Sequence, residues 1–355
     1  MNTISAADYE IVFNETAYSF LNQFVQKQNY SKIFILVDEN SSENCLPLFL
    51  QNFSIEIAFE IIELESGEIN KNIHTCTEVW TILTELGADR KSVIFNLGGG
   101  VITDLGGFIA STFKRGIDFI NIPTTLLAMV DASVGGKNGI DLGNLKNQVG
   151  TITNPKMVVI HSQFLETLPQ NQMRSGLAEM LKHGLIYDAN YWDLFLDLSQ
   201  LDTNDMDVLI HRAIEIKNNI VEQDPTENGI RKALNFGHTL GHAIESYFLE
   251  NKDKTTLLHG EAIAVGMILE SYLSTTLNLI TTEKYLQIKN TIKSIFGTVE
   301  ILDTDFTPIC DLLIHDKKNE YGKIQFTLLE EVGQVKINQE VSTDTIISSF
   351  LDYKS

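Results

Sequence analysis

Two histidines spaced four residues apart are the clearest candidates for chemistry in this sequence. His238 and His242 lie in the segment NFGHTLGHAIE, which we expect to be helical, so the spacing places both imidazoles on one face. A third histidine, His259, stands in LHGE and is predicted to begin the next helix. Two or three neutral imidazoles with one carboxylate can hold zinc and leave room for substrate oxygens. The spacing leaves open which of the three binds a metal, and a lone helical histidine is usually a satisfied core or surface residue.

A glycine turn is the second candidate. The segment NLGGGVITD (residues 96–104) follows a predicted strand and precedes a helix, and its three successive glycines let backbone N–H groups approach an anion closely. This setting holds the pyrophosphate of a dinucleotide, although the spacing differs from the Rossmann GxGxxG. Asp38, at the end of an earlier strand, could accept hydrogen bonds from an adenosine ribose. A plain turn and a helix N-cap are the respective alternatives.

Basic residues gather in a chain that is acidic as a whole. The net charge is −21, which argues against nucleic acid and anionic membrane surfaces as partners. The segment 114–147 nevertheless carries four basic side chains that could bind phosphate: Lys114, Arg115, Lys137 and Lys146. In SGLAEMLKHG, Glu179, Lys182 and His183 stand within about one helical turn, and a simple i,i+3 or i,i+4 salt bridge is the alternative to a functional role.

The elements that must position these residues fall into two halves. Short apolar runs at 31–38, 55–64, 92–97, 118–123 and 157–161 alternate with helix-length segments such as 73–86, which predicts βαβ units and a parallel sheet. Helical patterns then follow at 172–186, 206–221, 232–249, 261–278 and 283–295, with two strand-like runs at 324–329 and 334–338. We therefore predict domains at 1–164 and 165–355, which agrees with the prior of about 150 residues per domain.

The composition indicates a globular protein and a reducing compartment. Of 355 residues, 43% are apolar, enough to build a core. The three cysteines are odd in number and lack CxxC spacing, so we expect a reducing cytoplasm and no disulfide framework. We recognise neither a signal peptide nor an apolar run long enough to span a membrane.

Seven segments together resemble the 3-dehydroquinate synthase family of sugar-phosphate cyclases. They occur in the family's order over about residues 31–330: NLGGGVITDLGGF, RGIDFINIPTTLLAMVDASVGGKNGID, LKNQVG, SGLAEMLKHG, RKALNFGHTLGHAIE, LHGEAIAVGM and HDKKNEYGK. The sequence departs from the usual pattern at Leu145, where glycine is common, and at Ser66, where an acidic residue is common. The stretch 247–258 is also a few residues longer than usual.

The resemblance implies an N-terminal NAD-binding α/β domain with a parallel sheet and a mostly α-helical C-terminal metal-binding domain, as in the dehydroquinate synthase-like fold. It implies conversion of 3-deoxy-D-arabino-heptulosonate 7-phosphate to 3-dehydroquinate and phosphate in the shikimate pathway, by transient oxidation with NAD, phosphate elimination, reduction and intramolecular aldol closure. A divalent metal, zinc or cobalt, and a cytoplasmic homodimer are expected. The alternatives are a cyclase forming 2-deoxy-scyllo-inosose or an epi-valiolone, and a metal-dependent alcohol or glycerol dehydrogenase.

The resemblance also separates the site residues into groups. The matching metal ligands are Glu179, His238 and His259, and His242 matches a histidine that contacts substrate and relays protons. The other matching substrate positions are Arg115, Asp131, Lys137, Asn147, Lys182, Lys217, Arg231, Asn235 and either Lys317 or Lys318. The matching NAD positions are Asp38, Asn40, Ser66, Gly67, Glu68, Ile69, Asn70, Lys71, Gly98, Gly99, Gly100, Val101, Ile102, Thr103, Asp104, Thr124, Thr125, Lys137, Lys146, Phe164, Leu165, Glu166 and Thr167.

Overall fold

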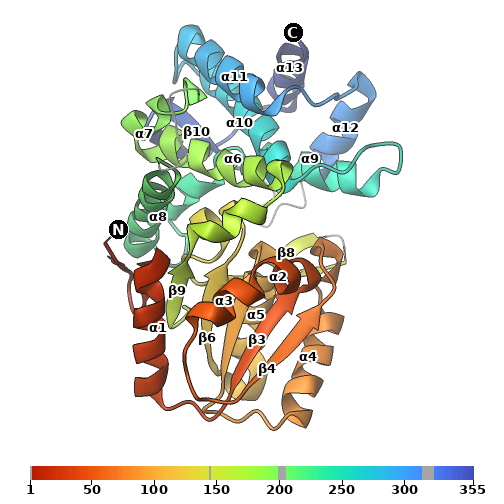
Figure 1. Ribbon diagram of the computed structural model, residues 1–355. Helices are drawn as coiled ribbons and strands as arrows, with labels where there is room; N and C mark the ends of the chain where they lie inside the picture. The colour runs from red at the N-terminus through yellow and green to blue at the C-terminus, as the bar shows by residue number, and fades with distance from the viewer. Residues whose placement is uncertain (1, 144, 199–204, 314–323) are drawn as a thin grey trace. The chain divides into compact units, whose positions relative to one another are not determined.

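The computed structural model describes residues 2–143, 145–198, 205–313 and 324–355, in two compact units, Met1–Pro169 and Gln170–Ser355 (Figure 1). The first unit is an α/β layer structure, and the second is mostly helical. Within the described residues, no helix is both long and apolar enough to cross a membrane.

A seven-stranded sheet organises the described part of the first unit. Its strand order is β1-β2-β9-β6-β5-β3-β4, with parallel pairing except between β1 and β2 at one edge. The strands are β1 (Ile4–Ser5), β2 (Glu10–Phe13), β3 (Ile33–Asp38), β4 (Phe59–Leu64), β5 (Val93–Gly98), β6 (Asp118–Pro123) and β9 (Met157–Ile160). The predicted parallel sheet is confirmed, but the strand predicted from residue 55 begins at Phe59, and the edge strands β1 and β2 were not predicted.

Helices cover both faces of this sheet. They are α1 (Asn14–Gln28), α2 (Glu39–Asn44), α3 (Leu46–Asn52), α4 (Ile73–Glu85) and α5 (Gly100–Thr112), with short turns at Glu68–Asn70, Phe113–Arg115 and Ser162–Thr167. Successive side chains of a strand point to opposite faces. Accordingly, Ile94 joins a core with Val79 of α4 and Leu105 of α5, whereas the ring of its neighbour Phe95 contacts Phe49 of α3. The connection between β3 and β4 thus lies on one face, and α4 and α5 lie on the other.

The strand order reverses at β3, since β4 follows on one side of it and β5 on the other. In open α/β sheets, ligands bind outside the carboxyl ends of the strands at such a reversal. Here those ends are Asp38 of β3 and Gly98 of β5. The topology therefore favours ligand binding at the two segments for which the sequence predicted nucleotide contacts.

A hairpin made of β7 (Lys137–Leu142) and β8 (Leu145–Ile152) packs against α5 and was not predicted. The contact is close because α5 carries Gly107, where an added Cβ would lie 1.9 Å from Oδ1 of Asn138 on β7. A π-helical turn, Ala128–Ala132, precedes the hairpin. The π-helical turn and the first part of the hairpin fall in the segment 114–147, which carries the predicted phosphate-binding groups.

The second unit contains α6 (Gln170–Tyr187), α7 (Ala189–Asp193), α8 (Asp205–Gln223), α9 (His238–Glu250), α10 (His259–Thr276), α11 (Thr282–Phe296), α12 (Asp303–Leu312) and α13 (Thr343–Lys354), and the hairpin β10 (Phe326–Glu331) with β11 (Gln334–Gln339). Four helix predictions are confirmed to within two residues. The helix predicted over 232–249 is wrong at its start, because a 3₁₀ turn, Ile230–Asn235, comes first. Gly237 then adopts a left-handed conformation with φ 77°, and α9 begins at His238.

Helices α9 and α10 touch backbone to backbone. An added Cβ at Gly266 of α10 would lie 2.0 Å from the carbonyl oxygen of Gly237, and one at Gly241 of α9 would lie 3.2 Å from the carbonyl oxygen of Ala262. Only glycine permits this approach. The two helices consequently fix the positions of the histidines at which each begins.

Candidate functional site

Three histidines and one glutamate converge in the second unit. Nitrogens of His238, His242 and His259 all lie within 4.8 Å of one another. The buried carboxylate of Glu179, on α6, places Oε1 3.4 Å from Nε2 of His238 and 3.7 Å from Nε2 of His259. His238 and His259 are the first residues of α9 and α10, and His242 lies one turn into α9. The predicted ligands are therefore brought together, but so is His242.

The backbone fixes the ring of His238. Its Nδ1 lies 3.1 Å from the carbonyl oxygen of Phe236, which can only accept a hydrogen bond, so Nδ1 carries the proton. In the neutral ring the lone pair is then on Nε2, the atom that faces Glu179. This is the tautomer that a metal ligand requires.

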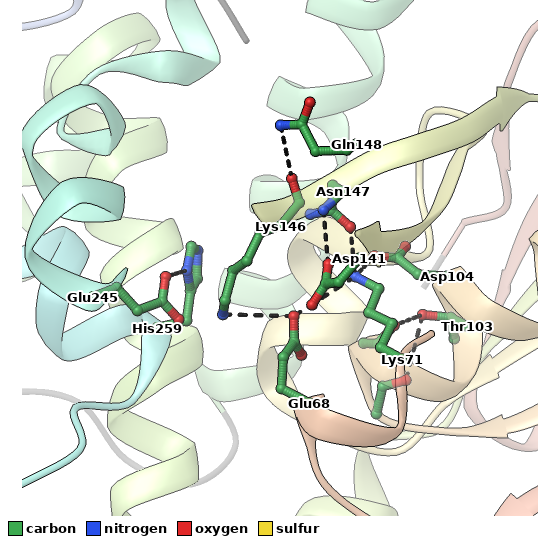
Figure 2. Close-up of polar contacts among 12 residues, drawn as sticks. Glu68, Lys71, Thr103, Asp104, Asp141, Lys146, Asn147, Gln148, Glu245 and His259 are labelled. Carbon is green, nitrogen blue, oxygen red and sulfur yellow. Dashed lines mark hydrogen bonds and ion pairs between the residues drawn. The ribbon is translucent and has the colours of Figure 1, made fainter. Parts of the chain in front are cut away.

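A carboxylate fixes the ring of His259 in the same way. Nδ1 of His259 lies 3.1 Å from Oε2 of Glu245 on α9, and Figure 2 shows this pair. Burial lowers the pKa of the His259 imidazole, but the charges of Glu245 and Glu179 and their hydrogen bonds outweigh it and raise the pKa to about 9. Without a metal, His259 is therefore protonated at neutral pH.

The donor set suits a divalent cation. Nε2 of His238, Nε2 of His259 and Oε1 of Glu179 point at one another, and all three are acceptors when the rings are neutral. Acceptors that converge need a positive charge between them, either a proton or a metal. Two imidazoles held by outer partners and one carboxylate are a typical zinc donor set.

Buried basic groups accompany this cluster in the second unit. Nζ of Lys182 bonds to Oε2 of Glu179, so the predicted i,i+3 pair does form. Lys217 on α8 and Arg231 in the 3₁₀ turn are also buried, and Arg231 donates to the carbonyl oxygen of Pro225 at 2.7 Å. The predicted Asn235 donates to Glu227 at 2.9 Å. The predicted basic positions Lys182, Lys217 and Arg231 are thus all buried, on three separate elements of this unit.

The carboxyl edge of the sheet in the first unit carries the glycine turn as predicted. β5 ends at Gly98, Gly99 is the N-cap, and α5 begins at Gly100, so backbone N–H groups stand at a helix N-terminus. Gly98 accepts from the N–H of Thr124 at 2.9 Å, and an added Cβ at Gly99 would lie 3.1 Å from Cγ2 of Thr125. The predicted NAD positions Gly98–Asp104 and Thr124–Thr125 are therefore neighbours in space.

Asp38 serves as a helix cap, one of the two uses considered for it. Its Oδ1 accepts from the N–H of Ser41 at 2.7 Å at the start of α2. Beside it in sequence, Glu39 accepts from the N–H and the hydroxyl of Ser66, each at 2.6 Å. The segment around Ser66 is thereby tied to the end of β3.

A polar cluster forms around Lys71 (Figure 2). Its buried ammonium lies 2.7 Å from both Oδ2 of Asp104 and Oδ1 of Asn147, and Glu68 pairs with Lys146 at 3.5 Å. Burial lowers the pKa of Lys71, but the charges of Asp104 and Glu68 outweigh it and raise the pKa, so Lys71 stays charged. Five predicted cofactor or substrate positions are thus joined within one unit.

The remaining predicted residues are spread over other elements. Arg115 has φ 69° in the turn after α5, Asp131 lies in the π-helical turn, and Phe164–Thr167 lie in the 3₁₀ turn after β9. Lys317 and Lys318 lie outside the described residues.

Sequence reasoning gave no role to three residues that hold predicted site residues in place. Glu245 bonds to His259, Glu270 bonds to the start of α9, and Asp141 accepts from the N–H of Asn147 at 2.7 Å. A signal existed for Glu245, which stands two turns after His238 and so on the same helical face. The sequence also offered a signal for Glu270, because a carboxylate in the otherwise apolar segment AIAVGMILESYL is expected to be buried with a partner.

Comparisons with known proteins cover almost the whole chain. The family model described as 3-dehydroquinate synthase N-terminal matches residues 61–175, and that described as 3-dehydroquinate synthase C-terminal matches residues 176–319. The chain is 44% identical to the 3-dehydroquinate synthase of Parabacteroides distasonis over 351 residues, 98% of each protein.

Two solved structures have a similar fold. A 2-deoxy-scyllo-inosose synthase complexed with carbaglucose-6-phosphate, NAD⁺ and Co²⁺ is similar with a TM-score of 0.84 and 25% identity over 99% of each chain. A 2-epi-5-epi-valiolone synthase of Streptomyces hygroscopicus with NAD⁺ and Zn²⁺ has a TM-score of 0.85 and 23% identity over 100% of this chain and 99% of the other.

Proposed function

Because this chain belongs to the 3-dehydroquinate synthase family, we propose that it converts 3-deoxy-D-arabino-heptulosonate 7-phosphate to 3-dehydroquinate and phosphate. The observation that carries the proposal is the convergence of Glu179, His238 and His259 in a chain that both family models match. The reaction belongs to the shikimate pathway, which leads to aromatic amino acids.

We propose that Glu179, His238 and His259 hold a divalent metal, zinc or cobalt, and that the first unit holds NAD. Support for the metal ligands is the orientation of both rings, since Phe236 and Glu245 direct each Nε2 toward Glu179. Support for NAD is the glycine turn at the reversal of strand order. When bound, NAD⁺ supplies a transient hydride acceptor, and the metal supplies a Lewis acid beside the reacting alcohol.

The chain's own residues bind and orient the substrate in this proposal. The basic and amide side chains assigned to the phosphate are Arg115, Lys137 and Asn147. Those assigned to the carboxylate and hydroxyls are Lys182, Lys217, Arg231 and His242. Asp131, Asn235 and either Lys317 or Lys318 are proposed as further substrate contacts. Orientation of a flexible sugar by such fixed groups can supply roughly 7–11 kcal/mol of the barrier reduction.

His242 is proposed to contact the substrate and move protons rather than bind the metal. Its ring lies 5.1 Å from that of His238 and 5.6 Å from that of His259, centroid to centroid, so it borders the donor set. Both proposed metal-binding rings place Nε2 opposite Glu179. Histidine is the side chain most often used for proton transfer in catalysis.

We propose that the protein works as a cytoplasmic homodimer. Cys45 and Cys76 are buried and, like Cys310, unlinked, which suits a reducing compartment. Light scattering of the purified protein tests the dimer.

Purified protein with NAD⁺ and zinc is expected to release phosphate from 3-deoxy-D-arabino-heptulosonate 7-phosphate without accumulating NADH, and chelation is expected to stop release. A metal-replete sample that releases no phosphate would contradict the proposal. Turnover instead of a sugar phosphate that lacks the carboxylate would indicate one of the other cyclases, and net NADH formation would indicate a dehydrogenase.

A further inference from the structure

The start of α9 receives its cap from another helix. The first N–H groups of a helix have no partner within it, and side chains at the N-cap usually satisfy them. Here the N-cap is Gly237, which has no side chain, and an added Cβ there would lie 2.5 Å from Cγ of Met267. The chain therefore cannot place a serine or aspartate at this position.

Glu270 of α10 takes over this function. Its side chain is fully buried, with Oε2 accepting from the N–H of Gly237 at 2.6 Å and Oε1 accepting from the N–H of Leu240 at 3.0 Å. A buried carboxylate that accepts backbone N–H bonds at a helix N-terminus is favoured in its charged form. Both oxygens thus hold the first turn of α9.

One of these bonds is linked directly to His238. The N–H of Gly237 and the carbonyl of Phe236 belong to the same planar peptide group. Its N–H donates to Glu270, and its carbonyl oxygen accepts from Nδ1 of His238 at 3.1 Å. The carboxylate therefore fixes the plane that orients the ring, and it polarises the carbonyl toward that ring.

We propose that Glu270 is a positioning residue for the metal site, acting on His238 through the peptide group between Phe236 and Gly237. This inference rests on the proposed metal ligands. Glu270 would then do for His238 what Glu245 does for His259. Helix α9 supplies the carboxylate that holds the first residue of α10, and α10 supplies the carboxylate that holds the first turn of α9.

The test is Glu270→Gln, which keeps the shape but offers only one carbonyl oxygen where the carboxylate offers two. The zinc affinity of the folded protein, measured by competition with a chromophoric chelator, is expected to fall about 10–100-fold, as for other outer partners of metal-bound histidines. In the metal-free protein, amide hydrogen exchange of the peptide 236–241 is expected to become faster. Glu270→Asp keeps the charge and both oxygens, so it should lose less affinity, and it serves if the glutamine variant does not fold.

The matched control is Ser274→Ala, one turn further along α10. It removes buried hydrogen bonds to the N–H of Leu329 on β10 and to the backbone carbonyl of Glu270, and leaves the Glu270 side chain and its bonds to α9 in place. This variant should lower the melting temperature yet bind zinc like the wild type. Unchanged zinc affinity in Glu270→Gln, with only a lower melting temperature, overturns the inference and leaves the metal site standing. Failure of the wild type to bind zinc, or unchanged affinity in His238→Ala, overturns the proposed ligands and this inference with them.

Discussion

Oε2 of Glu245 lies 3.1 Å from Nδ1 of His259, so a residue of α9 holds the first residue of α10. The bond fixes the ring and makes its other nitrogen more basic, as carboxylates do for metal-bound histidines. Glu245 is buried, so the bond is poorly screened by solvent.

Replacing this carboxylate tests the pairing. Glu245→Gln is expected to weaken zinc binding about 10–100-fold, because His259 loses the charged acceptor of its Nδ1–H. Chelator competition measures the affinity. Glu250→Gln, exposed at the end of the same helix, is the control and should bind zinc as the wild type does. Equal affinities in the two variants would contradict the role given to Glu245.

Substitution of the histidines one at a time tests the division of labour. His238→Ala and His259→Ala are expected to lose bound zinc, because each removes a donor. His242→Ala should keep the metal yet lose about 10²–10⁴-fold in kcat, the usual contribution of a proton-transfer group. Metal analysis with phosphate release distinguishes these results, and the exposed His74→Ala is the control. Loss of zinc from His242→Ala would overturn the assignment.

Zinc binding should depend on pH in a defined direction. The pKa of His259 is raised to about 9 in the metal-free protein, so zinc must displace a proton from it at lower pH. The dissociation constant is therefore expected to fall about tenfold per pH unit from about pH 7, and to level off as the pH passes 9. Chelator titrations from pH 7 to 9.5 measure this. Glu245→Gln should move the levelling to lower pH, since it removes a charge that raises the pKa, and an unmoved profile would speak against that cause.

Asp305 should stabilise the second unit. This buried carboxylate accepts from Tyr247 at 2.8 Å, from Lys254 at 2.5 Å and from the N–H of Leu302 at 2.7 Å. Asp305→Asn is expected to lower the free energy of unfolding by about 1–3 kcal/mol at pH 7, because it weakens bonds to buried donors. Urea denaturation measures the difference from the wild type.

The pH dependence of that difference is a further check. Burial raises the pKa of Asp305, but the hydrogen bonds from Lys254, Leu302 and Tyr247 outweigh it and leave the pKa lowered. A lowered pKa gives stability that is present above the unfolded value of about 3.9 and is lost as the pH falls through the folded value. The difference should thus shrink in acid. Asp303→Asn, on the exposed side of α12, should have little effect at either pH.

The central strands and most helices could be predicted because their patterns are local. Runs such as SVIFNL are apolar over the length of a buried strand, and β5 lies there. The hairpin of β7 and β8 was missed because its strands are rich in polar residues and glycine, and its pairing is set by packing on α5. The start of α9 was misplaced because helical spacing continues through RKALNFG. The left-handed conformation of Gly237 and its close approach to Met267 on another helix cannot be read from that spacing.

In the candidate site, too, local patterns could be predicted and contacts between helices could not. The types and spacing of His238, His242 and His259 indicated a metal, since i,i+4 neighbours meet whatever the rest of the fold does. Which acceptor holds each Nδ1 depends on contacts between helices, and helical spacing alone does not reveal that Glu270 reaches the start of α9.

The close contact of α9 and α10 has a consequence for the chain that joins them. Because glycines let the two backbones touch, the packing of the two helices, rather than the length of the connection at 251–258, sets the separation of His242 from His259. Lengthening such a connection is inexpensive, since doubling a flexible loop adds only about 0.6 kcal/mol of closure entropy. We therefore expect a short peptide inserted between the exposed Lys252 and Asp253 to leave the donor set undisturbed.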